Sequence, residues 1–296
     1  MPQVFTILTP QEVDTVLWEQ CLHNNKKQAS LYMHINYLHA LTDNWLPIIN
    51  QDYSIIAAVP YRKKWGIIYA YTAPFIQATT IVGAATAIEK KAILSIIQQK
   101  FRYGTLALNN INELSIGEEK TNFILPLNTI YANIERKFSA DLKQNIKKAY
   151  KYQLQYTHSN DLDDAITLYR IMNDHKTPHV KENNYSKLTN YCTNNSDHFY
   201  IRIAQDPNNR TLAIALLLKK YDKLYNILNA VTDNGRKLGA NHFLLSNIIK
   251  EFSNTNLTFD FEGSSIPGIQ QFLQGFNPIT EHYTIYHYNM LLRFKP

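Results

Sequence analysis

The stretch TDNGRKLGAN, Thr232 to Asn241, decides the fold. It follows a strand-like run, Lys223 to Ala230, and leads into a pattern with helical spacing, Leu238 to Phe252. We therefore expect a strand, a turn and a helix. Backbone N–H groups at such a turn, together with the dipole of the following helix, can bind an anion such as a pyrophosphate. The alternative is a plain helix start at which Gly239 allows close packing.

The elements around this stretch predict a second half made of hairpins and helices. Turn residues separate three strand-like runs, which indicates antiparallel pairing. One further strand, a helix and a last strand follow. The predicted elements are strands Phe199–Ala204, Thr211–Lys219, Lys223–Ala230, Leu257–Phe261 and His282–Tyr288, and helices Leu238–Phe252 and Ile266–Leu273.

The first half predicts the same mixture. Strand-like runs cover Tyr53–Tyr61 and Gly66–Tyr71, and a helical pattern covers Ala85–Tyr103. The segment Asn128 to Phe138 looks like a junction. We therefore expect an α/β (α+β) fold with two domains, residues 1–127 and 128–296, each with a mixed, mostly antiparallel sheet flanked by helices.

A basic helix is expected just after the junction, over SADLKQNIKKAYKY with Ser139 as its N-cap. Lys143, Lys147, Lys148 and Lys151 recur on one face of it. This face is either simply exposed to solvent or part of an anion site.

Composition sets the class of protein. The 296 residues are 45% hydrophobic and 18% charged, which is ordinary for a globular chain, and the net charge of +6 suits an anionic partner. Two cysteines exclude a disulfide framework. No signal peptide and no apolar run of membrane-spanning length is visible, so we expect a cytoplasmic protein without a membrane span.

The stretch LTFDFEGSSIPGIQQFLQGFNP, Leu257 to Pro278, resembles the Fem-type branch of the GNAT acyltransferase superfamily. Its strand end D-F-x-G and the later F-x-x-G-F are similar to the motifs of that branch. NGRKLGANHF resembles the R-x-x-G-x-G/A motif of GNAT enzymes, but Asn241 stands where Gly or Ala is usual. Asn277 likewise replaces an expected Gly. The likeness is strongest to uncharacterised proteins of Bacteroidetes-like bacteria, and it covers the second half better than the first.

This resemblance implies two GNAT-like lobes and N-acyl transfer from an activated donor to an amine. The donor, expected to be acyl-CoA such as acetyl-CoA, would bind at six residues of the second lobe: Arg236, Lys237, Leu238, Gly239, Ala240 and Asn241. Glu262 is the expected general base, with Tyr283 as a second catalytic residue. Glu262 could instead cap the next helix, and Tyr225, Tyr283 and Tyr286 could each be an acid or part of an aromatic wall. Asp260, on the opposite strand face from Phe261, could hold the backbone.

Several alternatives stay open at this point. The acceptor is a small-molecule or peptide amine, and DNA is not expected. The donor could be an aminoacyl-tRNA used on a cell-wall precursor, or the chain could be a non-catalytic binding protein that kept the fold. His175 and His179 have the i, i+4 spacing of a metal pair, but Pro178 breaks the helix between them, so we expect no metal.

Overall fold

The computed structural model describes residues 4–173, 177–195, 198–264 and 266–290. They form two compact units. Unit 1 comprises the chain up to Lys120 together with the chain from His282, and unit 2 runs from Thr121 to Glu281. Unit 2 is therefore continuous in sequence, whereas unit 1 is built from two separate segments.

The sheet of unit 1 is mixed and mostly antiparallel. Its strands follow the order β1-β2-β3-β4-β6-β13, and β5 pairs with both β3 and β6. Only the pairings of β6 with β4 and β5 are parallel. The strands are β1 (Phe5–Ile7), β2 (Asn44–Asn50), β3 (Ile56–Lys64), β4 (Ile67–Ala70), β5 (Thr79–Val82), β6 (Tyr103–Asn109) and β13 (Ile279–Asn289).

Helices α1 (Thr15–Asn24), α2 (Ile35–Leu41) and α3 (Ala87–Lys100) complete unit 1. Thr86 caps α3, where its hydroxyl accepts from the Glu89 N–H at 3.3 Å. Ile93 and Ile97 then fall on one helical face and pack with apolar residues of β2, β3 and β6. The helix pattern expected from Ala85 to Tyr103 is thus confirmed, with its end moved to Lys100.

The sheet of unit 2 has the order β7-β12-β11-β10-β9-β8. All pairs are antiparallel except β11 with β12, which are parallel. The strands are β7 (Glu118–Pro126), β8 (Gln155–Ser159), β9 (Phe199–Gln205), β10 (Thr211–Lys220), β11 (Lys223–Val231) and β12 (Thr258–Asp260).

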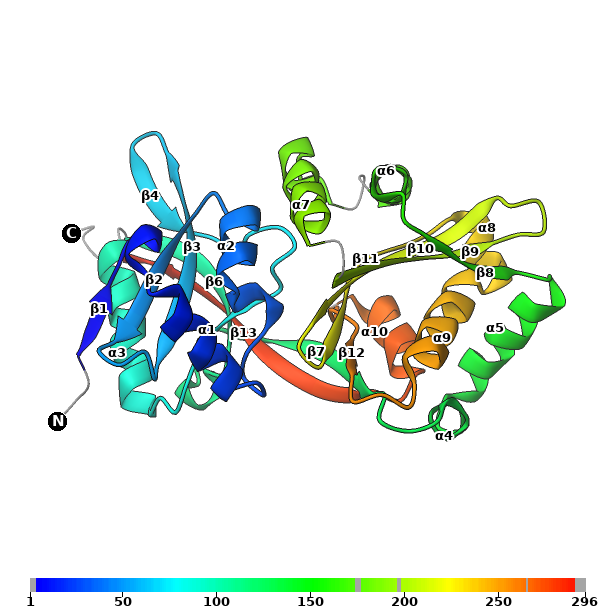
Figure 1. Cartoon of the computed structure of the whole chain (residues 1–296), viewed down its shortest axis with the longest axis horizontal. Coiled ribbons are helices and arrows are strands. Elements are labelled where there is room, and N and C mark those ends of the chain that lie inside the picture. Colours follow the sequence, from blue (N-terminus) through cyan, green and yellow to red (C-terminus); the bar gives the residue numbers. More distant parts are fainter. Residues whose placement is uncertain (1–3, 174–176, 196–197, 265, 291–296) are drawn as a thin grey trace. The chain divides into compact units, whose positions relative to one another are not determined.

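Helices cover both faces of this sheet (Figure 1). On one side lie α6 (Leu162–Asn173) and α7 (Glu182–Asn194). On the other lie α5 (Ala140–Lys151), α9 (Ala240–Phe252) and α10 (Pro267–Gln274), with α4 (Tyr131–Arg136) and α8 (Asp233–Leu238) beside them. Ser139 caps α5 as expected, since the Leu142 N–H donates to its hydroxyl.

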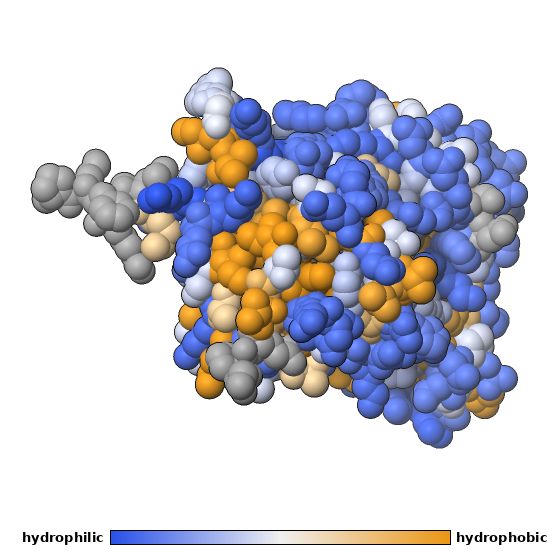
Figure 2. Space-filling model, turned by 60° about the vertical axis from the view of Figure 1, so that its left-hand side comes forward, coloured by the Kyte–Doolittle hydropathy of each residue, from blue (hydrophilic) through white to orange (hydrophobic). Residues whose placement is uncertain are grey.

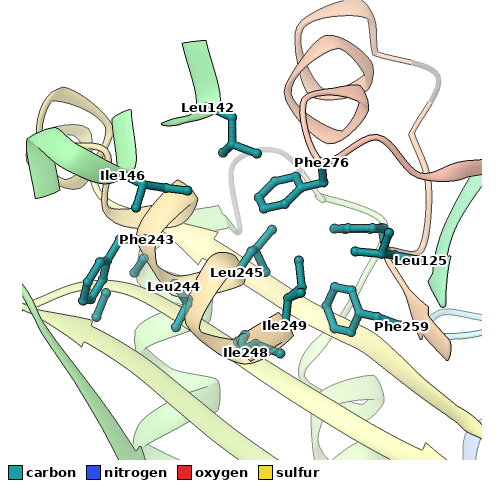
Figure 3. Close-up of a cluster of buried hydrophobic side chains, with 14 of the residues drawn as sticks. Leu125, Leu142, Ile146, Phe243, Leu244, Leu245, Ile248, Ile249, Phe259 and Phe276 are labelled. Carbon is teal, nitrogen blue, oxygen red and sulfur yellow. The ribbon is translucent and has the colours of Figure 1, made fainter. Parts of the chain in front are cut away.

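Helix α9 forms the centre of the core of unit 2 (Figure 3). Leu244, Ile248 and Ile249 are fully buried. Phe243 lies near Ile146 of α5, and Phe259 of β12 lies beside Ile249. One helix therefore holds α5, α10 and the sheet in place, and its first turn is fixed by packing further along.

The expected fold class is confirmed: the chain is mixed α/β, with a mostly antiparallel sheet and flanking helices in each unit. The domain division 1–127 and 128–296 stays a prediction. The compact units differ from it at the C-terminus, because β13 pairs with β6 from Thr284 to Asn289 and so belongs with unit 1.

Candidate functional site

A pocket of about 580 Å³ opens in unit 2 where two parallel strands part. β11 and β12 pair over only three residues, from Lys223 to Tyr225, and β12 ends at Asp260. β11 continues to Val231, and its later residues form one wall of the pocket. Two parallel strands that separate leave a slot at their carboxyl ends, where open α/β sheets commonly bind ligands.

One side of this pocket is apolar. Helix α10 contributes Ile266, Ile269, Phe272 and Leu273, and Phe261 follows β12. Ile266 and Ile269 are 61% and 44% exposed. Leaving these apolar side chains in water forgoes the free energy that their burial would contribute. This wall therefore suits the apolar part of a ligand.

The other side is polar and rich in amides. Its side chains are Asn173, Asn226, Asn229, Arg236, Asn241 and His242. Two of them form a reciprocal amide bridge between β11 and α9. Asn229 Nδ2 donates to Asn241 Oδ1 at 3.0 Å, and Asn241 Nδ2 donates to Asn229 Oδ1 at 2.8 Å. The bridge fixes the first turn of α9 against the strand.

This bridge explains an oddity of the sequence. Asn241 departs from the Gly or Ala of the GNAT motif, and the structure shows it paired with a second polar residue in an apolar strand. Asn173 of α6 adds a further contact, since its Nδ2 donates to the Asn229 carbonyl at 3.3 Å. Asn241 is therefore part of a hydrogen-bonded group of asparagines at the pocket.

Asn226 carries a buried acceptor at the pocket. Its residue is 6% exposed, and its Oδ1 has no hydrogen-bond partner among the described residues. A buried amide oxygen without a donor costs about 1–3 kcal/mol. It lies beside a β-bulge, because the β10 register shifts between Leu216 and Leu217 and leaves Ile227 outside the ladder. Such an oxygen is ready to accept from the N–H or ammonium of a ligand.

His242 is the titratable side chain of the pocket that sequence analysis missed. It sits in the first turn of α9, with its ring edge-on to Phe272 at 4.7 Å between centroids. Burial lowers its pKa, and the negative charge of Asp141 only partly opposes this. The ring is therefore neutral at pH 7, the form that can accept a proton.

The turn expected over Thr232 to Asn241 is wrong in detail. The chain instead forms α8 from Asp233 to Leu238, and α9 begins at Ala240. Thr232 caps α8, with the Gly235 N–H donating to its hydroxyl at 2.9 Å. A polar, glycine-containing run can form a short capped helix as readily as a turn, which is why the sequence did not separate the two.

Gly239 has a structural reason to be glycine. Its φ of +74° is left-handed, and a Cβ placed on it would lie 2.5 Å from the Asn145 carbonyl oxygen of α5. Only glycine allows this approach without strain. The close-packing alternative considered from the sequence accounts for this residue.

The six residues expected to bind the donor divide into two groups. Arg236 and Asn241 line the pocket. Lys237 is exposed, Leu238 packs against the core, and Gly239 and Ala240 are buried. Donor binding by these residues remains a prediction. The geometry favours Arg236 and Asn241 as its direct contacts.

Glu262 follows β12 and is half-buried. It has a left-handed φ of 60°, and its N–H donates to Asp260 Oδ1 at 3.0 Å. Its neighbours Phe261 and Gly263 line the pocket, whereas Glu262 is not among the described lining residues. Its role as general base stays a prediction.

Asp260 holds the backbone here, as the sequence analysis suggested. It is 4% exposed and accepts from Asn122 Nδ2 at 3.0 Å as well as from the Glu262 N–H. Burial raises the pKa of this carboxyl, although Lys223 and these donors oppose the shift. Asp260 therefore shapes the loop that closes one end of the pocket.

The candidate tyrosines lie elsewhere. Tyr283 is half-buried in the part of β13 that belongs to unit 1. Tyr286 accepts from Gln98 Nε2 at 2.5 Å and packs on the core of unit 1. Tyr225 is buried in the sheet of unit 2. None of the three is among the described residues that line the pocket, so a catalytic role for Tyr283 stays a prediction.

The described part of the chain holds no group of three or more His, Cys, Asp or Glu side chains placed to bind a metal. His175 of the suggested pair lies outside the described residues. Within the described residues, no helix combines the length and apolarity needed to cross a bilayer.

One sequence signal could have revealed more of the pocket. The strand KLYNILNAV places Asn226 and Asn229 in an otherwise apolar run. Buried amides in a central strand need partners, so they mark a polar site. His242 could not have been found this way, because its burial depends on the packing of α10.

This arrangement defines a class. Two strands part, an amide-rich wall faces an apolar helix, and a helix begins at the slot within a mixed, mostly antiparallel sheet flanked by helices. Comparison with solved structures shows that the chain has the GNAT/Fem-like acyltransferase fold. No family model matches the sequence. No curated relative matches it either.

Three solved structures illustrate the likeness. FemX has a TM-score of 0.65 at 12% identity, with 98% of each chain covered. The C-terminal domain of a putative lysylphosphatidylglycerol synthetase from Agrobacterium fabrum has a TM-score of 0.55 at 10% identity, covering 95% of this chain and 92% of that one. A GCN5-related N-acetyltransferase from Sphaerobacter thermophilus has a TM-score of 0.54 at 10% identity, covering 96% and 94%.

Proposed function

We propose that this protein is an N-acyltransferase that moves an acyl group from an activated donor to an amine, with the acyl arm of the donor held in the pocket of unit 2. The observation that carries the proposal is the slot where β11 and β12 part, closed by an apolar wall on α10 and an amide wall on β11. The names of the similar structures, which include an N-acetyltransferase, agree with it.

Acyl-CoA is the donor that the pocket favours. The pantetheine arm of coenzyme A is thin, partly apolar and carries amide N–H groups. Asn226 Oδ1 is a buried acceptor without a partner among the described residues, so it can accept from such an N–H. Arg236, half exposed at the edge of the pocket, suits a phosphate of the same donor.

His242 gives the proposal a base. The attacking amine must lose a proton as it adds to the acyl carbonyl, and the thiolate of coenzyme A then leaves. A neutral imidazole inside the pocket can accept that proton. Glu262 remains the rival base that the family resemblance suggests.

Donor binding is tested by thermal shift with coenzyme A, acetyl-CoA and an aminoacyl-tRNA. A ligand that binds only the folded state raises the melting temperature. At a concentration of 100 times its Kd, it adds about 2.7 kcal/mol to the free energy of unfolding. We expect coenzyme A and acetyl-CoA to do so. Asn226→Leu should keep or raise the basal melting temperature, because it removes a buried amide oxygen that has no described partner, yet lose the ligand shift. Retention of the shift in Asn226→Leu would place the donor elsewhere.

The base is tested by His242→Gln and Glu262→Gln in parallel, with His287→Gln on β13 as an exposed control. Release of free thiol from acetyl-CoA is a clean readout, because both cysteines of the protein are buried. We expect His242→Gln to keep the donor shift but lose about 10²–10⁴-fold in kcat, with partial recovery at high pH. Loss in Glu262→Gln alone would assign the base to Glu262 instead.

An aminoacyl-tRNA donor is the second candidate, and one observation favours it. A groove of about 400 Å³ between α4 and α5 is lined by Arg136, Lys143, Lys147 and Tyr150. Three cations beside an aromatic ring suit a nucleic acid backbone and base. Binding of this kind weakens steeply with salt, because neutralised phosphates release counterions. Salt-sensitive binding of charged tRNA, without any shift by coenzyme A, would decide for this donor.

Measuring acyl transfer distinguishes a non-catalytic binding protein from both kinds of transferase. Such a protein would show a ligand shift but no acyl transfer to any amine in a mixed acceptor pool. The cytoplasmic location expected from the sequence stays a prediction.

A further inference from the structure

The β3–β4 hairpin of unit 1 ends in an unusual tip. Lys64 pairs with Ile67, so Trp65 and Gly66 form a two-residue loop. Their φ angles of 50° and 82° are both left-handed, as in a type I′ turn. Figure 1 shows the hairpin, at the β4 label, reaching beyond the other strands of unit 1.

The folding of this turn does not call for tryptophan. Type I′ turns favour Asn, Asp or Gly at the first loop position, and a bulky residue with positive φ is rare. Trp65 is 89% exposed, so burial of its side chain does not offset this strain. The other two tryptophans, Trp18 and Trp45, are buried. An exposed tryptophan at a turn position that disfavours it indicates a role in binding rather than in folding.

The surroundings of Trp65 are apolar and cationic at once. Ile67 is 50% exposed beside it, and Lys63 and Lys64 are exposed on the other strand. The Lys64 ammonium lies 4.6 Å from the Trp65 ring centroid. Neither lysine forms an ion pair with a described acidic residue, whereas Arg62 pairs with Asp43 at 2.5 Å. Figure 2, which turns this side of the molecule forward, shows apolar side chains at the surface among hydrophilic ones.

We propose that this tip docks the protein on an anionic lipid surface. Tryptophan favours the headgroup level of a bilayer, where its ring is half solvated. Ile67 would enter the acyl boundary beside it, and Lys63 and Lys64 would meet the phosphates of anionic headgroups. An aliphatic side chain next to the ring favours lipid over nucleic acid, because base stacking uses only the aromatic face.

Tryptophan fluorescence gives a direct readout. Because Trp18 and Trp45 are buried, a shift on adding vesicles reports Trp65. We expect vesicles of phosphatidylglycerol and phosphatidylcholine to shift the emission to the blue and to sediment the protein, and the effect to weaken with salt. Vesicles of phosphatidylcholine alone should bind much less.

Substitutions assign the effect to the tip. Trp65→Asn supplies a residue that the turn prefers, so it should keep or raise the melting temperature while weakening sedimentation on the order of tenfold. Replacing Lys63 and Lys64 by Gln should cost about fivefold for each lysine. The matched controls are Ile88→Gln, which removes another exposed apolar side chain, and a Lys26→Gln, Lys27→Gln pair, which removes the same charge elsewhere in unit 1.

Three outcomes would overturn the proposal. One is no sedimentation with anionic vesicles at low salt. Another is equal binding by Trp65→Asn and the unaltered chain. The third is a blue shift with a single-stranded RNA oligonucleotide but not with vesicles, which would make the tip a nucleic acid contact.

Discussion

Two asparagines of unit 2 stand at positions where the sequence motifs favour a small residue, and each has a local structural cause. Asn277 stands where the Fem-type sequences that this chain resembles usually have Gly, yet its φ of 53° is left-handed, the conformation that Gly would supply. Asn tolerates this conformation better than other side chains do. Asn241 replaces a small residue and is paired with Asn229. Both departures therefore have a structural role in this fold, and they do not by themselves indicate a lost site.

Asp260 is expected to make stability depend on pH. Burial raises its pKa, so the folded state disfavours the ionised carboxyl. The stabilisation that this carboxyl contributes is therefore complete at pH values below its pKa in the unfolded chain. It is lost as the pH rises through its pKa in the folded protein. Asp260→Asn should therefore gain stability relative to the unaltered chain as the pH rises above about 4, the ordinary pKa of an aspartate. Urea unfolding across that range measures it.

The control is Asp233→Asn, an acid with 94% of its side chain exposed. This variant measures how the removal of an exposed carboxyl changes stability over the same range. If the Asp260→Asn difference does not change with pH, Lys223 and the hydrogen-bond donors fully offset the effect of burial, and the pKa of Asp260 is not raised.

At the scale of elements, periodicity predicted most of the fold. The strands of the β9–β11 meander and helix α5 appear close to their expected bounds, because strong apolar patterns and turn residues specify them locally. β2 was not predicted, since Pro47 interrupts its apolar run. α8 was read as a turn. The pocket could not be predicted as a whole, because it arises where β11 and β12 part, which depends on tertiary pairing.

The junction of α8 and α9 should tolerate no side chain. Gly239→Ala combines a left-handed φ with a Cβ 2.5 Å from the Asn145 carbonyl oxygen. We expect a loss of about 2–4 kcal/mol of unfolding free energy from strain and overpacking. Chemical denaturation measures it.

Gly268→Ala in α10 is the matched control. A Cβ there would meet nothing within 4 Å, and alanine is the better helix former. It should be neutral or stabilise by up to about 1 kcal/mol. Equal effects of the two substitutions would show that α5 moves away easily from the junction.

At the scale of the whole molecule, the two units have different chain topology. Unit 2 is one continuous segment, whereas the sheet of unit 1 includes β13 from the far end of the described chain. Stability of unit 1 therefore depends on a contact between residues distant in sequence.

Thr284→Pro should separate the two units in a hydrogen-exchange experiment. Thr284 is 3% exposed and faces Leu108 on β6, and proline would remove a donor from the ladder. Amides of β6 should lose protection, while those of β10 and β11 keep theirs. Simultaneous loss in both strands would mean that the units unfold together. The exposed Ile279→Pro is the control at the start of the same strand.

The late position of β13 also has a consequence during synthesis. The ribosome makes β6 long before β13, and all of unit 2 is made between them. Unit 2 can therefore fold while the chain is still growing. The edge of β6 that pairs with β13 stays unpaired until β13 has been made. Such a waiting strand is a template for pairing with other chains. A nascent chain stalled before His282 should thus be the form that chaperones hold most strongly.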